Sequence, residues 1–573
     1  MTMRFLLVTV LCFLFFSTAA AAQNEKTVAG FTEEEVLLFG EKMYREGVLP
    51  SGEPMEAIVM GDIPVDGRMF TCDDCHQRSG LGSVEGTVIT WPTNGRELYR
   101  PRRKTGAWRQ PESEEAKMDV RKNLPAYWEQ IEEARPAYTD ESLATVLWTG
   151  VDPTGRKLNP VMPLYHLEDS DMAIMVHYLK NLSVDLPPGV DDTTIRFATV
   201  VSEDIPAEAR EAMLAILQAH VDVRNSQSRH QERRAESGPF YKTEMHQAYR
   251  RWELDIWELQ SPANTWSRQL QEYYHKQPVF ALLGGLVEGS WQPIHEFCEE
   301  HKIPAIFPLT DFPVISESDW YTLYFSKGFY QEGEAAARYL QAQENIVSGT
   351  KIVMVSRQGM AGSYLNRGFS EIWQEFGRPG PEHIKLAPDK KLSEQFWRDI
   401  MQAKQPDVLI LWLEPVDLAN IRTLVGEKKL PGKIILSAEM LDYSFTAIPD
   451  NLRDNVYLTY SYSLPDSQKR SKQAVKQWLR ARKIPVTDLK MQSKMYFLGW
   501  MLTGAVKSMR SEFFRDYFLE GFDMMIDQDY AIAVYPRLTF GSGQRYASKG
   551  CYIVQLTRGS KPELIKRSDW VIH

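Results

Sequence analysis

The chain has 573 residues, of which 43% are hydrophobic and 25% charged, a balance typical of a globular protein with room for about two to four domains. This composition excludes a disordered or fibrous chain. The formal net charge of -10 gives no support to nucleic-acid binding, although an acidic protein can dock on a basic partner.

The first residues have the pattern of a secretory signal peptide. Arg4 supplies a positive charge, residues 5–16 form an apolar core, and small residues follow. The core is too short for a comfortable membrane span, and no later stretch approaches the roughly 20 apolar residues that a span needs. We therefore predict a leader at residues 1–22 and a soluble protein exported to the periplasm. The oxidising environment of the periplasm would allow Cys298 and Cys551 to form a disulfide. The sequence does not decide whether these two cysteines pair.

The most specific motif of the chain is Cys72-Asp-Asp-Cys75-His76. Two thiols and an imidazole at this spacing can hold a haem covalently, because the cysteines form thioethers with the porphyrin and His76 coordinates the iron. A disulfide, a redox dithiol and half of a zinc site are the alternatives. A disulfide gives His76 no role, however, and no second Cys-x-x-Cys completes a zinc site. We predict one covalent haem c.

A loop with prolines on both sides carries Met162, our candidate for the sixth ligand of the iron. A thioether favours the reduced iron and raises its potential, and the prolines would hold the loop rigidly. His166 is the second candidate. Met172, Met175 and His177 also lie nearby, but they fall within the next predicted helix, from which the iron is hard to reach.

Helices are predicted on both sides of these ligands, over residues 31–47, 140–149 and 171–182. The first begins with Thr32 and Glu35 at capping-box spacing and has an apolar face. Gly40, inside that face, indicates a close helix crossing. Residues 100–135 are highly charged and predict an exposed insertion. Its first basic residues could attract haem propionates or an acidic partner, or form a solvated surface; they are Arg100, Arg102, Arg103 and Lys104.

Residues 31–183 resemble a class I cytochrome c, an all-α electron-transfer domain. The resemblance implies that Gly40 and Tyr44 pack against the helix that carries Tyr178, and that Pro92 offers its carbonyl to the His76 imidazole. It also implies that Met162 completes the iron. The chain between His76 and Met162 is longer than in compact members of the family, and the charged insertion accounts for the difference. The matching positions are Gly40, Tyr44, Cys72, Cys75, His76, Pro92, residues 138–143, residues 150–155, Met162, Pro163 and residues 178–180.

Residues 184–194 contain two prolines, a glycine and three acids, and predict a linker. Strand and helix patterns alternate beyond it, which predicts an α/β domain over residues 195–573 with two lobes, each a doubly wound parallel sheet. The expected strands are 195–201, 253–259, 278–283, 304–307, 352–356, 408–413 and 434–437, and the expected helices are 207–223, 265–275, 291–301, 362–376 and 416–425.

This second part resembles the type I periplasmic solute-binding proteins of the leucine/isoleucine/valine-binding group. The resemblance implies that two lobes close over a small organic ligand, with Ser290 and Thr310 in the first lobe and Tyr364 and Glu439 in the second. Alternatively, Ser290 only caps a helix and Glu439 is a turn residue. Residues 224–234 are polar and basic where relatives commonly have a Gly-rich turn, which argues against an ordinary amino acid. The resembling phrases are residues 280–290, 302–310, 329–338 and 541–546.

The sequence contains no Walker motif, no His-Glu-x-x-His and no Gly-x-Ser-x-Gly, so we predict no enzyme. Our main interpretation is an exported monohaem cytochrome that transfers electrons with a redox partner protein, while its second domain recognises a ligand or partner. The alternative is a periplasmic solute receptor or sensor, similar to the substrate-binding proteins of ABC transporters, whose haem reports redox state or gas.

Overall fold

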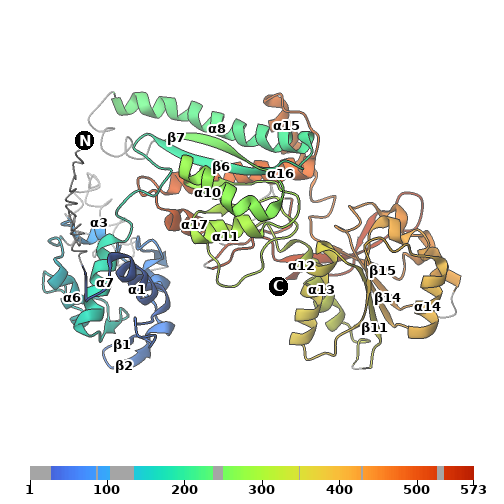
Figure 1. Ribbon diagram of the computed structural model, residues 1–573, viewed down its shortest axis with the longest axis horizontal. Helices are drawn as coiled ribbons and strands as arrows, with labels where there is room; N and C mark the ends of the chain where they lie inside the picture. Colours follow the sequence, from blue (N-terminus) through green and yellow to red (C-terminus); the bar gives the residue numbers. More distant parts are fainter. Residues whose placement is uncertain are drawn as a thin grey trace, which may run out of the picture. The chain divides into compact units, whose positions relative to one another are not determined.

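The chain divides into two compact units, Met1–Val184 and Asp185–His573 (Figure 1). The predicted leader at residues 1–22 and the basic residues Arg103 and Lys104 lie outside the described residues. Within the described part, no helix is both long enough and apolar enough to span a membrane. The computed structural model describes residues 27–85, 88–102, 134–236, 250–347, 349–426, 430–525, 534–541 and 543–572.

Unit 1 combines helices with a small sheet, so it is not purely α-helical as predicted. Strands β1, β2 and β5 form an antiparallel sheet in the order β2-β1-β5. In β1, the buried residues Ala57 and Val59 alternate with more exposed residues. This two-residue alternation is typical of a strand with one buried face. The elements of unit 1 are α1 (Glu33–Glu46), β1 (Glu56–Val59), β2 (Ile63–Asp66), η1 (Gly67–Met69), α2 (Cys72–His76), β3 (Val84–Glu85), β4 (Val88–Ile89), α3 (Gly95–Leu98), α6 (Asp140–Thr149), β5 (Leu164–Tyr165) and α7 (Asp169–Asn181).

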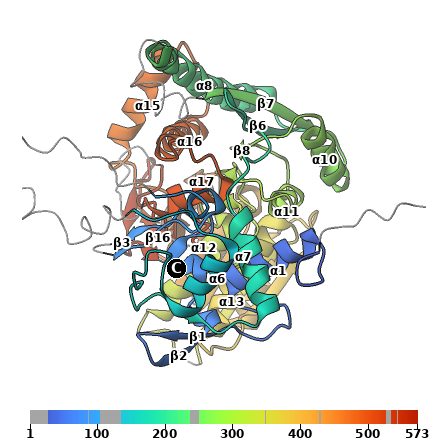
Figure 2. The same cartoon turned by 90° about the vertical axis from the view of Figure 1, so that its left-hand side faces the viewer.

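The close crossing predicted at Gly40 is present between α1 and α7, which lie with α6 in Figure 2. A Cβ atom added at Gly40 would stand 2.3 Å from the Cβ of Tyr178, so only glycine fits without a shift. The rings of Tyr44 and Tyr178 lie 5.6 Å apart. The predicted packing of Gly40 and Tyr44 on this helix is therefore confirmed, as is the capping box of Thr32 and Glu35.

The first lobe of unit 2 is a parallel sheet in the order β10-β9-β8-β6-β7. Apolar residues of β6 alternate between its two faces. Phe197 packs in one cluster with Met213 of α8 and with α16, whereas Val200 packs with Trp266 of α10 and with α11. The elements are β6 (Thr194–Ser202), α8 (Ala207–Glu236), β7 (Arg251–Leu259), η2 (Ala263–Thr265), α10 (Trp266–Lys276), β8 (Ala281–Leu283), α11 (Gln292–Glu300), β9 (Ala305–Ile306), β10 (Thr322–Leu323), α16 (Leu489–Ser508) and α17 (Arg515–Asp523).

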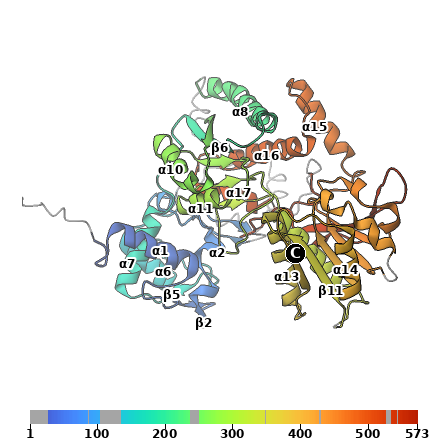
Figure 3. The same ribbon diagram turned by 45° about the vertical axis from the view of Figure 1, so that its right-hand side comes forward.

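The second lobe has a sheet in the order β12-β11-β13-β14-β15-β16-β17, in which β12 to β15 are parallel and β16 and β17 antiparallel. Figures 1 and 3 show α13 on one face and α14 on the other. The elements are α12 (Gly328–Gln341), β11 (Ile352–Arg357), α13 (Met360–Glu375), β12 (Glu382–Leu386), α14 (Glu394–Lys404), β13 (Val408–Trp412), η3 (Pro415–Leu418), η4 (Ile421–Gly426), β14 (Lys433–Ser437), η5 (Phe445–Ala447), η6 (Asp450–Leu452), β15 (Val456–Tyr460), β16 (Gly550–Leu556), β17 (Leu564–Lys566) and β18 (Val571–Ile572). Helix α15 (Lys469–Ala481) follows β15 in the chain but packs against α8 and α16 of the first lobe.

Two sequence predictions for unit 2 need correction. The helix expected at 416–425 is instead the pair of 3-10 helices η3 and η4, because Asn420 at the break turns its side-chain amide to the Leu392 carbonyl at 3.0 Å. The helix expected at 207–223 continues as α8 to Glu236, since no glycine or proline interrupts residues 224–236.

Candidate functional site

The motif predicted to bind haem, Cys72-Asp-Asp-Cys75-His76, forms the short helix α2 in unit 1. Thr71 caps it, and its N–H donates to Asp74 Oδ2 at 3.0 Å. Cys72 and Cys75 are not joined as a disulfide. The Cys72 thiol donates to the Tyr165 hydroxyl at 3.6 Å, and burial raises the pKa of this thiol to about 12.

The His76 imidazole is prepared to act as a ligand. Its side chain is 9% exposed, and Nδ1 donates to the Trp91 carbonyl oxygen at 2.8 Å. Burial lowers the pKa of His76 to about 4, so the ring is neutral at pH 7. Nε2 then carries a lone pair, and it has no hydrogen-bond partner among the described residues. The predicted acceptor, the carbonyl of Pro92, is wrong by one residue, because the Trp91 oxygen is the one within hydrogen-bond distance.

The predicted distal loop lies beside the haem-binding motif. Met162 is half-buried at the edge of the unit 1 core, and its N–H donates to the Asn159 carbonyl at 2.9 Å. Tyr165, which contacts Cys72, follows in the same segment. His166 is exposed, and its N–H pairs with the strand β1. An unpartnered buried nitrogen and two unbridged thiols at this spacing fit a covalent haem.

The described ends of the charged insertion are anchored to unit 1, contrary to the prediction that it is exposed throughout. The Arg102 guanidinium lies 3.9 Å from the centre of the Trp91 ring. Arg135 is 6% exposed because its guanidinium donates to the carbonyls of Glu97, Leu98, Arg100 and Pro136. Arg100 itself is exposed, as expected.

The residues predicted for the ligand cleft of unit 2 fall in three places. Ser290 accepts a hydrogen bond from the Gln292 N–H at 3.2 Å, the helix-capping alternative. Thr310 accepts from the Phe312 N–H at 3.0 Å, and the Phe312 ring lies 5.5 Å from that of Tyr364. Thr310 and Tyr364 are therefore brought together through Phe312, whereas Glu439 belongs to a separate cluster of charges.

Glu439 follows β14 and is held by two partners. The Lys490 ammonium lies 2.8 Å from Oε1, and the Tyr443 hydroxyl donates to Oε2. Burial alone would raise the pKa of Glu439, but Lys490 and Lys494 outweigh it and lower that pKa. Burial and the charge of Glu439 raise the pKa of Asp311. Two acids and two lysines thus form one partly buried cluster, which we call the charge cluster.

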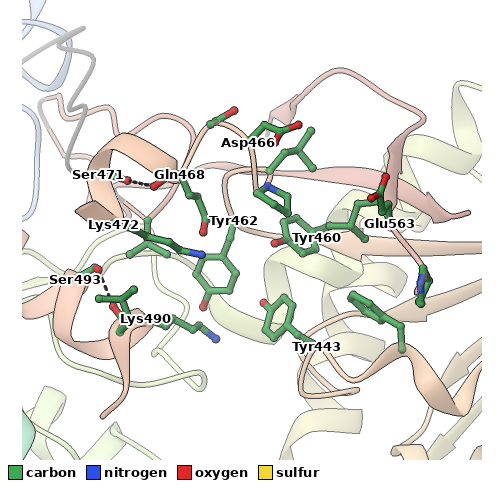
Figure 4. A pocket seen from close by; sticks show the side chains of 18 residues that line it. Tyr443, Tyr460, Tyr462, Asp466, Gln468, Ser471, Lys472, Lys490, Ser493 and Glu563 are labelled. Atoms are coloured by element: carbon green, nitrogen blue, oxygen red, sulfur yellow. Dashed lines mark hydrogen bonds between the residues drawn. The ribbon is translucent and has the colours of Figure 1, made fainter. Parts of the chain in front are cut away.

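A cavity of about 770 Å³ lies against this cluster, and Figure 4 shows its walls. Most of its aromatic residues follow β14 and β15, and its lysines come from α15 and α16. The sequence did not indicate these residues, although the alternation Tyr460-Ser-Tyr462 at the end of a buried strand is a usable signal. The lining is Tyr443, Phe445, Tyr460, Tyr462, Leu464, Pro465, Asp466, Ser467, Gln468, Ser471, Lys472, Leu489, Lys490, Ser493, Val534, Pro562, Glu563 and Leu564.

Glu332 of α12 is a buried carboxyl group that the sequence did not indicate. The hydroxyls of Thr459 and Ser461 each donate to it at 2.8 Å. Burial and the charge of Glu439 raise its pKa to about 7. Cys551 lies 3.7 Å from the Ser461 hydroxyl and forms no disulfide with Cys298.

Two α/β lobes with largely parallel sheets, and a cavity large enough for a small molecule in the same unit, define the class of two-lobed solute-binding folds. The chain belongs to the periplasmic binding protein family, whose model matches residues 250–561. Members of this family are solute-binding proteins and not enzymes, as predicted. The match lies within unit 2 and does not include the haem-binding motif.

Several solved structures have a similar fold. A fatty acid ABC transporter substrate-binding protein from Thermomonospora curvata is 16% identical, over 68% of this chain and 95% of that chain, with a TM-score of 0.42. A branched-chain amino acid ABC transporter from Thermus thermophilus with bound valine is 11% identical, over 66% and 97%, with a TM-score of 0.45. A solute-binding protein from R. palustris in complex with benzoate is 14% identical, over 66% and 98%, with a TM-score of 0.44. No curated protein matches the chain.

Proposed function

We propose that the protein is a periplasmic solute receptor whose second unit binds a small organic ligand. The observation that carries this proposal is the cavity of about 770 Å³, which is in the range of small-molecule sites and is lined by aromatic residues together with polar and charged ones. In this scheme residues 1–22 are an export leader, residues 31–183 a cytochrome domain, residues 184–194 a linker and residues 195–573 the receptor.

The proposal predicts that a small organic compound stabilises unit 2. A ligand present at 100 times its Kd adds about 2.7 kcal/mol to the free energy of unfolding. We expect such a compound to raise the melting temperature of the full chain by a few degrees in a thermal-shift screen of amino acids, aliphatic acids, aromatic acids and sugars. A screen in which no compound raises the melting temperature would contradict the receptor function.

As a second function we propose that unit 1 carries a haem c and exchanges single electrons with a redox partner protein. The observation in its favour is the buried Nε2 of His76, which has no partner within the described residues. Cys72 and Cys75 would hold the haem as thioethers, and His76 and Met162 would be the axial ligands. A bound haem supplies a reversible one-electron couple. The Trp91 carbonyl contributes by fixing the proton on Nδ1, which leaves Nε2 for the iron.

Replacing the proposed distal ligand tests this assignment. Protein that is expressed together with a haem c maturation system should show a low-spin c-type absorption spectrum, with a sulfur-to-iron charge-transfer band near the red end of the visible range. Met162→Ala should remove the band and lower the midpoint potential, because the thioether stabilises reduced iron. Met172→Ala, in α7, is the matched control and should change neither. If Met162→Ala leaves both unchanged, the ligand is another residue, with His166 the next candidate.

A further inference from the structure

The aromatic residues of the cavity form a continuous wall. The ring of Tyr443 lies 5.6 Å from that of Tyr460 and 5.5 Å from that of Tyr462. The Lys490 ammonium lies over two of these rings, 4.7 Å from the centre of Tyr443 and 4.3 Å from that of Tyr462. These contacts hold the tyrosines in fixed positions, so they present a preformed aromatic surface to a planar guest.

The charge cluster beside this wall is already balanced. Lys490 pairs with Glu439 at 2.8 Å, and Lys494 donates to the Tyr462 hydroxyl at 3.3 Å, with Asp311 as the second acid near these lysines. Because Glu439 also accepts a hydrogen bond from Tyr443, its two oxygens are both engaged. Glu439, the acid of the charge cluster next to the cavity, therefore needs no cation from a ligand.

Lys472 also lines the cavity and is exposed, and the nearby lining acid Asp466 pairs with Lys469 at 2.9 Å. Lys472 has no ion-pair partner within the described part of the chain, and burial together with the neighbouring Lys476 lowers its pKa. Figure 4 shows Lys472 and Lys490 on one side of the tyrosines and Glu563 on the other. Glu563 is exposed on the β16–β17 hairpin, so water screens its charge as it does that of the exposed Lys472.

We propose that the cavity binds an aromatic carboxylate that lacks an ammonium group. The ring lies against Tyr443, Tyr460 and Tyr462, and the carboxylate pairs with Lys472. This inference rests on the proposed receptor function and names its ligand class. An α-amino acid fits less well, because its ammonium finds Glu439 already paired and lies close to lysines of the same sign. A saturated acid loses the aromatic contact, worth about 0.5–1.5 kcal/mol beyond the buried area.

Calorimetric titration of the full chain with four matched probes tests this ligand class. The probes are 3-phenylpropanoate, its neutral amide, 3-cyclohexylpropanoate and L-phenylalanine, which adds only the ammonium group to the first. We expect 3-phenylpropanoate to bind most tightly. Lys472→Gln should weaken its binding about fivefold, the effect of losing a partly exposed ion pair. Lys476→Gln is the control, because Lys476 lies on the same helix but does not line the cavity.

The outcomes separate this inference from the receptor function. L-Phenylalanine binding as tightly as 3-phenylpropanoate would overturn the ligand class and place its ammonium on Glu563. An unchanged affinity in Lys472→Gln would overturn the carboxylate contact. If none of the four probes binds while another compound of the thermal-shift screen does, the ligand class is wrong and the receptor function stands. If no compound of either set binds, the receptor function fails with it.

Discussion

Glu332 illustrates how a single buried group links stability to pH. It is fully buried and keeps its proton up to a pKa of about 7, whereas its ordinary pKa is 4.5. Between pH 4.5 and pH 7, therefore, the Glu332 carboxyl group holds its proton in more of the folded molecules than of the unfolded ones. The contribution of Glu332 to the free energy of unfolding is therefore greatest below pH 4.5 and is lost as the pH rises to 7.

We expect Glu332→Gln to remove this dependence, because the amide is neutral at every pH and can still accept from the Thr459 hydroxyl. The unfolding free energy of the variant relative to the wild type should rise between pH 4.5 and 7.5 by about 3 kcal/mol. Urea denaturation at a series of pH values measures this difference. Glu375→Gln, at an exposed site of α13, should give a flat difference. A flat difference for Glu332→Gln as well would contradict the raised pKa.

At the scale of elements, two helix glycines should respond to alanine with opposite signs. In Gly40→Ala the new methyl group meets the Tyr178 Cβ at 2.3 Å, so α1 and α7 must move apart. Overpacking of this kind costs about 1–3 kcal/mol. Gly504 lies inside α16, is exposed, and has its nearest neighbour at an ordinary 3.8 Å. Gly504→Ala should stabilise the helix by up to about 1 kcal/mol. Urea denaturation of both variants checks the signs, and equal signs would contradict the packing at Gly40.

The helices and strands also show which parts of the fold could be predicted from the sequence. Local signals were sufficient for the capping box at Thr32, for the helix end at Gly150 and for the alternation of strands and helices. The helix expected at 416–425 failed because a contact of Asn420 with a distant loop interrupts it. The cavity could not be predicted for a similar reason, because its tyrosines and lysines come from segments that only the fold brings together. The ion pair of Glu439 with Lys490 likewise produces no pattern in the sequence.

For the whole molecule, the cores have a direct consequence for unfolding. The cluster around Tyr44, Leu143 and Tyr178 draws its residues from unit 1, and the other described clusters draw theirs from unit 2. A compact unit with its own hydrophobic core can unfold as a cooperative step of its own. Cys72 packs against the core of unit 1, and Tyr460 and Tyr462 of the cavity belong to a core of unit 2, so each proposed site depends on a different core.

We therefore expect scanning calorimetry of the full chain to resolve two transitions. Gly40→Ala should lower the midpoint of the one that belongs to unit 1 and leave the other in place. Gly504→Ala should raise the midpoint of the transition of unit 2 only, since α16 packs in its core. A compound that binds the cavity should move the same transition as Gly504→Ala, because a ligand stabilises only the unit that folds around it. One transition that shifts with either glycine variant would show instead that the two units unfold as a single cooperative body.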